Sequence, residues 1–226
     1  MDIFQALVLG IVQGLTELLP VSSSAHLFLI PWIFGWQEIG DFDVALHFGT
    51  LLAIGIFFFK DWIELIKGGY NQVVKKENST EGRMFWYIVI ATIPGGAIGF
   101  LLDHFAEDIL TNQFIIATAL IIMGIILYVV DKKSKSEVEY KDMTFKQTFL
   151  IGLSQALAFI PGVSRSGVTM TTARAMGVKR EAAAKYSFML SAPIVLAATA
   201  YKIKDFAFGD ISFYIGVLAS FIVGIL

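Results

Sequence analysis

The chain has 226 residues, of which 56% are hydrophobic and 16% are charged, and its formal net charge is −2. A soluble domain carries about 25% charged and 45–50% apolar residues, so this composition indicates a polytopic membrane protein. The slightly negative charge argues against a nucleic-acid partner, and the lack of cysteine excludes disulfide bonds, thiolate catalysis and thiol metal sites.

Two apolar segments are interrupted, and each exceeds the roughly 20 residues that one bilayer crossing needs. The first covers residues 3–34, and the second, residues 145–176, follows three uninterrupted apolar segments. The N-terminus has neither a basic leader nor a small-residue cleavage site, so we expect no removable signal peptide. The predicted spanning helices are residues 43–59, 84–102, 114–130, 186–203 and 211–226.

Proline and a serine-rich stretch break each interrupted segment near its middle. Non-helical backbone at membrane depth persists only where it is buried in protein or lines a polar cavity. We therefore predict two re-entrant helical hairpins, each of which returns to the side from which it enters. A single kinked spanning helix with a polar tail is the alternative for each segment.

The two interrupted segments are also similar to each other, because a shift of 142 positions aligns them without gaps. Three spans lie between them, an odd number, so the second copy is expected to be inverted. We predict an all-α fold with a single membrane domain (1–226), a first repeat (1–142) and an inverted, incomplete second repeat (143–226). Such repeats place the functional site near the bilayer midplane. The matched pairs include Gln5/Gln147, Gly10/Gly152, Gln13/Gln155, Ser22/Ser164 and Ser24/Ser166.

Loop charges predict the orientation in the cell membrane. Residues 60–83 and 131–146, which we interpret as loops, are rich in Lys and Arg, whereas the connector at 103–108 is acidic. Because cytoplasmic loops are enriched in Lys and Arg, both basic loops are expected in the cytoplasm. The first hairpin then enters from outside and the second from the cytoplasm.

The first hairpin carries the sequence QGLTELLPVSSSAH over residues 13–26. Gln13 and Glu17 are four residues apart, so they share one face of a helix that Pro20 ends. The serines Ser22, Ser23 and Ser24 are suited to cap the next helix, whose N-terminus is an anion site. His26 would lie near the same point, where an imidazole can act as base, acid or nucleophile.

The second hairpin carries PGVSRSGVT over residues 161–169. Ser164 and Ser166 can cap the helix that follows Pro161, and Thr169 lies one turn further on. Arg165 supplies a planar fork that binds phosphate oxygens in pairs. If the two tips meet, an anion would have donors on two sides.

Glu17 would repel a bare phosphate at such a site. It is therefore expected either to hold a divalent cation or to move a proton. Ligation by carboxylate and phosphate oxygens suits Mg²⁺ or Ca²⁺.

Each of these residues also has a structural interpretation. Glu17 could snorkel to the interface, the serines could only cap helices, and Arg165 could form a structural ion pair with Glu17. His47 lies one turn after Asp43 near the start of a helix and is a reserve candidate for the cavity.

The two motifs together resemble undecaprenyl pyrophosphate phosphatases of the bacitracin-resistance type, in order and spacing over essentially the whole chain. The resemblance implies a membrane enzyme that removes the terminal phosphate of undecaprenyl pyrophosphate and so regenerates the carrier lipid for cell-wall synthesis. It also implies an inverted-repeat fold, divalent-cation dependence and a site open to the outside. The functional positions that it implies are Gln13, Glu17, Ser23, His26, Ser164, Arg165 and Thr169.

The sequence departs from that family pattern in two ways. Gln13 stands where the family's acidic pair has its first member, which puts more weight on Glu17. The chain ends at Leu226 within an apolar run, where family members continue for about one or two helices. We therefore expect a second repeat that is one crossing shorter than the first.

The resulting hypothesis is hydrolysis of a polyprenyl diphosphate at a multi-pass membrane site. Arg165, Ser164 and the helix N-termini would bind the diphosphate, and His26 or Ser23 would act as the nucleophile or activate one. A transporter or flippase of a lipid phosphate is the alternative, since carriers also use broken helices in inverted repeats. The expected partners are the polyprenyl diphosphate and membrane lipids, and the sequence leaves a homodimer open.

Overall fold

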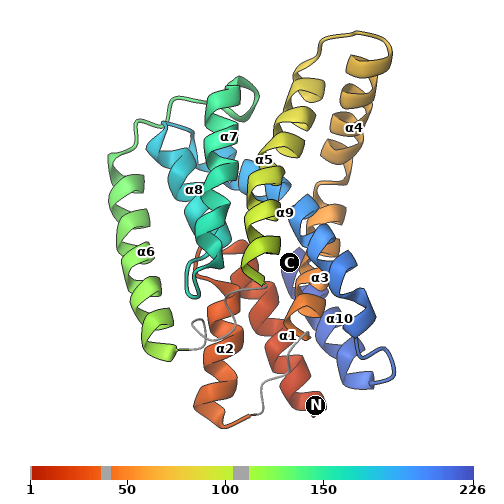
Figure 1. Cartoon of the computed structure of the whole chain (residues 1–226), viewed down its shortest axis with the longest axis vertical. Helices are drawn as coiled ribbons and strands as arrows, with labels where there is room; N and C mark the ends of the chain where they lie inside the picture. The colour runs from red at the N-terminus through yellow and green to blue at the C-terminus, as the bar shows by residue number, and fades with distance from the viewer. Residues whose placement is uncertain (1, 37–41, 104–111) are drawn as a thin grey trace.

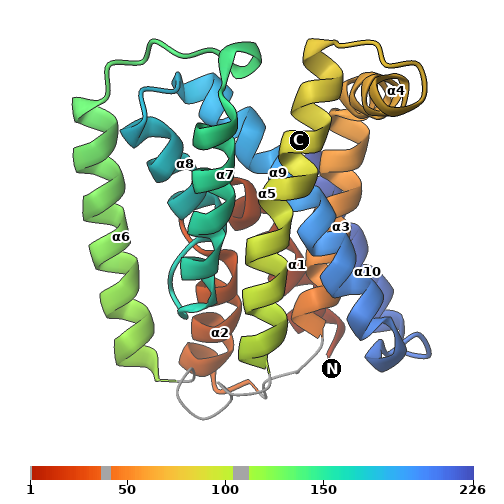
Figure 2. The ribbon, with the colours of Figure 1, turned by 45° about the horizontal axis from the view of Figure 1, so that its top comes forward.

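The computed structural model describes residues 2–36, 42–103 and 112–226. Within these ranges the secondary structure is helical apart from one isolated bridge between Val138 and Val178, which confirms the all-α prediction. Figures 1 and 2 show the arrangement of the helices. The α-helices are α1 (Ile3–Leu18), α2 (Ser23–Phe34), α3 (Phe42–Phe57), α4 (Phe59–Val74), α5 (Thr80–Asp103), α6 (Gln113–Lys133), α7 (Phe145–Ser154), α8 (Arg165–Ala175), α9 (Arg180–Lys202) and α10 (Ile211–Ile225). Short 3₁₀ turns are η1 (Tyr140–Asp142), η2 (Gln155–Phe159) and η3 (Ile203–Asp205).

Several described helices are apolar enough to lie in a membrane. By length and composition, α6 and α9 can each cross one, and α3 and α4, which meet at a bend of 78°, would add a third span if counted together. The predicted spans at 43–59, 84–102 and 211–226 coincide with α3, α5 and α10. Most of the predicted acidic connector, residues 104–108, lies outside the described residues.

Each interrupted segment forms two helices that meet at a tip and run back in nearly opposite directions (Figure 2). The open ends of α1 and α2 lie at the lower end of the molecule, and those of α7 and α8 lie at the upper end. The single kinked helix is therefore wrong for both segments. Re-entry of the hairpins into a bilayer and the division into two repeats stay predictions.

The helices that surround the hairpins pack in a matched way. α10 lies along α1, and α5 lies along α7. A Cβ atom on Gly10 would come within 2.4 Å of the Gly216 carbonyl oxygen, and one on Gly152 within 2.2 Å of the Ala91 carbonyl oxygen. Small residues allow such close helix crossings in membrane proteins. Gly10 and Gly152 are a matched pair of the predicted repeats, and both lie at such a close crossing.

A buried arginine fixes the base of the second hairpin. The Arg174 side chain, 4% exposed, donates to Asp131 Oδ1 at 2.7 Å and to the Val178 carbonyl oxygen at 2.6 Å. These bonds join the end of α8 to α6 and to the start of α9. They satisfy a buried charge, which would otherwise be costly.

The interpretation of residues 60–83 as a loop is wrong. Most of this segment is α4, which packs on the first turns of α5. Leu65 and Gly69 are buried in that contact. The segment has a mixed composition with few long apolar runs, so only its helical periodicity could have revealed the helix.

Candidate functional site

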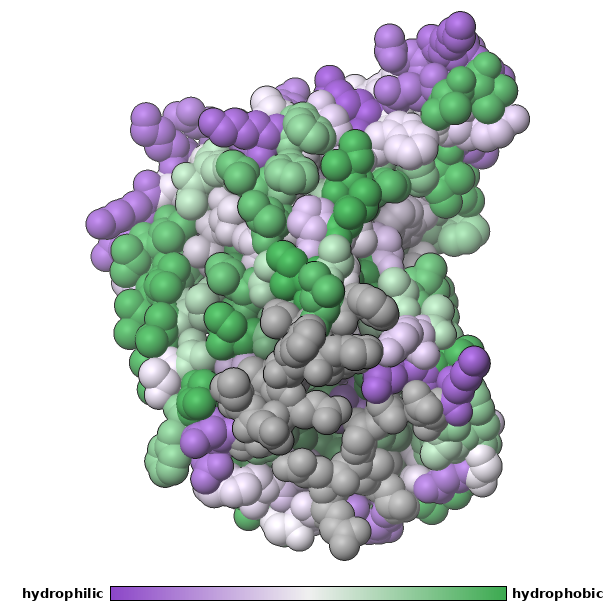
Figure 3. All heavy atoms as spheres, in the orientation of Figure 1, coloured by the Kyte–Doolittle hydropathy of each residue, from purple (hydrophilic) through white to green (hydrophobic). Residues whose placement is uncertain are grey.

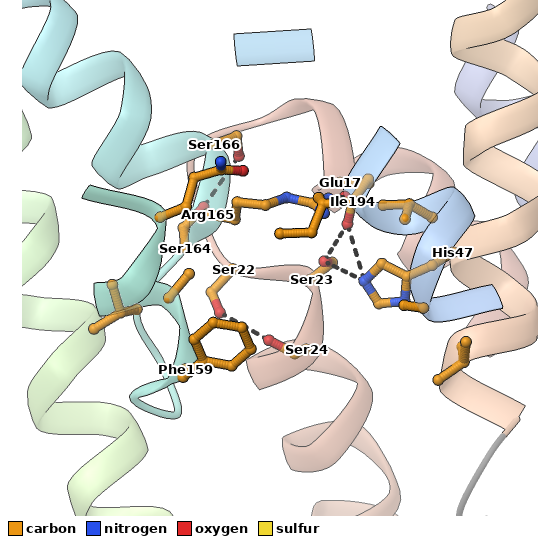
Figure 4. A pocket seen from close by; sticks show the side chains of 16 residues that line it. Glu17, Ser22, Ser23, Ser24, His47, Phe159, Ser164, Arg165, Ser166 and Ile194 are labelled. Atoms are coloured by element: carbon orange, nitrogen blue, oxygen red, sulfur yellow. Dashed lines mark hydrogen bonds and ion pairs between the residues drawn. The ribbon is translucent and has the colours of Figure 1, made fainter. Parts of the chain in front are cut away.

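The tips of the two hairpins are in contact with each other (Figure 4). Arg165, the first residue of α8, forms an ion pair with Glu17 near the end of α1. Beside it, the Ser166 hydroxyl donates to the Leu19 carbonyl oxygen at 3.1 Å. The first hairpin thus supplies the carboxylate, and the second supplies the guanidinium.

Glu17 is the centre of the cluster, and its side chain is only 7% exposed. The Arg165 guanidinium contacts its Oε1 atom. Its Oε2 atom accepts a hydrogen bond from Ser23 Oγ at 2.5 Å and another from Gln13 Nε2 at 3.1 Å. Four side chains therefore hold this carboxylate, counting His47, which is 3.2 Å from Oε2. Burying it without such partners would be strongly unfavourable.

His47 is the residue that sequence reasoning kept only in reserve. It reaches the cluster from α3, with Nε2 also 3.5 Å from Ser23 Oγ. Its Nδ1 lies 2.7 Å from the Asp43 carbonyl oxygen. Since a carbonyl oxygen only accepts, Nδ1 carries a proton and Nε2 is left to face Glu17 and Ser23. The signal available in the sequence was an ionisable side chain inside an apolar helix.

Both hairpin tips present the start of a helix. Ser22 caps α2 by accepting from Ala25 N at 3.4 Å, and Ser164 caps α8 by accepting from Gly167 N at 3.0 Å. Ser22 has a φ of +64°, an uncommon backbone conformation that costs about 1–3 kcal/mol and persists only where the surrounding structure holds it. Two helix N-termini facing one space make a ready anion site.

The remaining predicted residues lie around this cluster. Gln13 is fully buried, and its Oε1 atom has no hydrogen-bond partner among the described residues. Thr169 bonds the Ser187 hydroxyl at 2.7 Å, so it holds α8 against α9. His26 Nδ1 lies 2.8 Å from the Ser22 carbonyl oxygen and not against Glu17. The Oγ atoms of Ser24 and Ser22 are 3.4 Å apart. In the second hairpin, the Oγ atoms of the matched residues Ser166 and Ser164 are 3.1 Å apart.

A cavity of about 260 Å³ opens beside the cluster. Its polar side is formed by Glu17, His47, Arg165 and the cap serines of both tips. Its apolar wall comes from α3, α9 and the second tip, and consists of Val44, Ala158, Phe159, Val163, Ile194, Val195 and Ala198. Thr169, Gln13 and His26 are not among the lining residues. The cavity thus joins an anion-binding end to a hydrocarbon-like wall.

The fold and the site define a multi-pass membrane protein with a polar cluster and a cavity where two helical hairpins meet. Residues 6–226 match the sequence model of the family described as Bacitracin resistance protein BacA. The chain belongs to that family.

Several relatives of known name align with nearly the whole chain. A protein of Pelotomaculum thermopropionicum is 52% identical over 99% of this chain and 84% of its own length. Proteins of Desulforudis audaxviator and Caldicellulosiruptor bescii are 48% and 47% identical, each over 100% of this chain and 86% of its own length. All three are named undecaprenyl-diphosphatase.

Proposed function

We propose that this protein is an undecaprenyl-diphosphatase, which hydrolyses the lipid diphosphate to the monophosphate and inorganic phosphate. Family membership and the names of the relatives support the reaction. The observation that carries the proposal is the contact of Glu17 with both Ser23 and Arg165 between two helix N-termini. This contact brings a nucleophile, a base and a cation to one anion site.

The diphosphate is bound by donors from both hairpins. The N–H groups at the starts of α2 and α8 point to the phosphate oxygens, and Arg165 neutralises charge that spreads over the terminal phosphoryl group. The apolar wall that contains Phe159 and Ile194 takes the first part of the prenyl chain. Burial of the chain contributes about 0.8 kcal/mol per CH₂ group, while the headgroup contacts set the chemistry.

Ser23 is the nucleophile in this proposal. When the substrate enters, the Arg165 guanidinium turns from Glu17 to the phosphate oxygens, and the released carboxylate accepts the proton of Ser23 Oγ. Oγ then attacks the terminal phosphorus, the bond to the bridging oxygen breaks, and the monophosphate lipid leaves with that oxygen. Glu17 passes the proton it took from Ser23 to the leaving monophosphate and is a base again. It then takes a proton from water, whose oxygen attacks the phosphoserine. The bond to Oγ breaks, inorganic phosphate is released, and Glu17 returns the proton to Ser23 Oγ.

A divalent cation is proposed to accompany the diphosphate. Among the described residues no group of three His, Cys, Asp or Glu side chains could hold a metal ion. Glu17 and the unpaired Oε1 atom of Gln13 are nevertheless oxygen ligands, which suits Mg²⁺ or Ca²⁺ when phosphate oxygens complete the shell. Bound there, the ion would neutralise phosphate charge.

Chelation is accordingly expected to abolish turnover without unfolding the protein. When EDTA is added at 5 mM, roughly a 100-fold molar excess over the protein, phosphate release should fall at least tenfold. Addition of Mg²⁺ or Ca²⁺ should restore it. The protein itself supplies few ligands, so its thermal unfolding temperature in detergent should change little. Full turnover in the chelator would exclude the cation.

The decisive experiment for the reaction is release of inorganic phosphate from undecaprenyl diphosphate by the purified protein in detergent. Micelles have no two compartments, so a carrier would form no product there. Stoichiometric phosphate and undecaprenyl monophosphate are expected. If the protein binds the lipid but forms no product, the transporter hypothesis would replace the enzyme hypothesis.

The site is proposed to open to the extracytoplasmic side of the cell membrane. The cavity is lined by the first turns of α3 and the second half of α9, at Val44, His47, Ile194 and Ala198. These parts of α3 and α9 lie toward one end of the molecule (Figure 2). The basic segments around α4, the end of α6 and the α8–α9 junction lie at the opposite end. Cytoplasmic segments are enriched in Lys and Arg, so the basic end faces the cytoplasm.

The two histidines are expected to differ in importance. His47→Gln should lower kcat about tenfold to 100-fold with little change in KM, because His47 holds Glu17 and Ser23 in place. His26→Gln is the matched variant, and its loss should be smaller because, among the described residues, the His26 side chain hydrogen-bonds to a backbone carbonyl oxygen and not to Glu17 or Ser23. Michaelis–Menten kinetics of both variants test this, and a larger kcat loss for His26→Gln would reverse the assignment.

A further inference from the structure

We propose that α4 is an interfacial helix that binds the surface of a bilayer containing anionic phospholipids. The helix leaves α3 at a bend of 78°. In Figure 2 it is seen nearly end-on, whereas α3 and α5 run along the length of the molecule. It therefore lies across the basic end of the bundle, in the direction expected of a membrane surface.

Packing against α5 fixes which face of α4 points outward. A Cβ atom on Gly69 would lie 2.3 Å from the Phe85 ring, and one on Gly68 would lie 2.6 Å from Gly82 N. On another side, Asp61 forms an ion pair with Lys185 of α9. The helix cannot turn about its own axis without losing these contacts, so its outer face is set by the fold.

That outer face is an apolar strip. Phe59, Ile66, Tyr70 and Val73 recur at helical spacing, and they are 60%, 54%, 60% and 62% exposed. No other described helix covers them. A strip of this kind on a surface helix is the feature that inserts into the boundary between headgroups and acyl chains.

Lysines border the strip and indicate the headgroup charge. At 100° per residue, Lys60 and Lys67 lie together along one edge of the strip, and Lys75 and Lys76 follow the last turn. All four are exposed. Such lysines can keep their stems in hydrocarbon and their ammonium groups among phosphates. Figure 3 shows hydrophobic and hydrophilic side chains adjoining at the upper right, where Figure 1 places α4.

The lack of native cysteine allows single spin labels to test this placement in the full chain. Ile66→Cys labels the strip, and Asn71→Cys labels the polar side of the same helix. In nanodiscs containing phosphatidylglycerol, the label at 66 should be accessible to oxygen and shielded from a water-soluble nickel chelate. The label at 71 should show the reverse. Equal nickel access at both positions would overturn the proposal, as would a label at 66 that neither reagent reaches, which would indicate a protein partner.

The charge requirement is tested with the same label. Adding Lys60→Gln and Lys67→Gln should raise nickel access at position 66 at least twofold, and so should replacing phosphatidylglycerol with phosphatidylcholine. As a control, Lys132→Gln with Lys133→Gln removes the same amount of charge at the end of α6. This pair should leave nickel access at position 66 unchanged. If nickel access does not change with the α4 lysines or with lipid charge, the proposed preference for anionic phospholipids is overturned. Unchanged phosphate release in every variant confirms that each chain is folded.

Discussion

Replacing Arg165 with alanine is expected to lower phosphate release about 10³-fold, since arginines that neutralise a transferring phosphoryl group are worth about 10³–10⁵-fold in rate. The guanidinium lies at the start of α8 and touches Glu17 across the two tips. Without it, the diphosphate loses its main cationic contact, and Glu17 loses its counter-ion. Arg165→Lys keeps the charge but not the planar fork, so it should recover only part of the activity. The measurement is turnover at saturating substrate.

A loss of folding must be separated from a loss of catalysis in that variant. Breaking a buried ion pair leaves an uncompensated charge, which costs about 3–5 kcal/mol. Arg165→Met combined with Glu17→Gln removes both charges, and should unfold at nearly the wild-type temperature while remaining inactive. Wild-type turnover by a folded Arg165→Ala chain would remove Arg165 from the mechanism. Recovery of turnover in the double variant would reduce the pair to a structural role.

The sequence predicted which residues belong to the site better than it predicted which side chains each of them contacts. Pro20 and Gly162 break apolar segments that are too long for one crossing, so the tips could be located from the chain alone. Glu17 and Arg165 are ionisable groups beside those breaks, and polar groups at membrane depth are functional candidates. The structure places them in contact, as the predicted meeting of the two tips requires.

The parts that could not be predicted depend on packing between distant helices. His26 and His47 are both single histidines in apolar helices, and only the placement of α3 beside α1 brings His47 to Glu17. The family resemblance implies a functional role for Thr169, which lies one turn beyond Ser166. In the structure its hydroxyl hydrogen-bonds to Ser187 of α9, a contact that no local pattern encodes.

Ser23→Ala is expected to lower turnover about 10³-fold or more, because the alanine side chain can neither attack phosphorus nor give a proton to Glu17. The protein should stay folded, since Arg165, His47 and Gln13 still hold the buried carboxylate. Ser24→Ala is the matched control: Ser24 also lines the cavity, but among the described residues its hydroxyl hydrogen-bonds to Ser22 and not to Glu17, so turnover should fall less than about tenfold.

The covalent step gives the Ser23 prediction its sharpest test. Substrate labelled with ³²P in the terminal phosphate should leave label on the wild-type chain after a rapid quench, and Ser23→Ala should carry none. The bond type then separates the candidates, because a phosphoserine survives acid whereas a phosphohistidine is hydrolysed by it. Acid-stable label that disappears with Ser23 supports the serine. Acid-labile label that persists in Ser23→Ala and disappears in His26→Gln would transfer the nucleophile to His26, which would then have to move toward Glu17 from its backbone contact at Ser22.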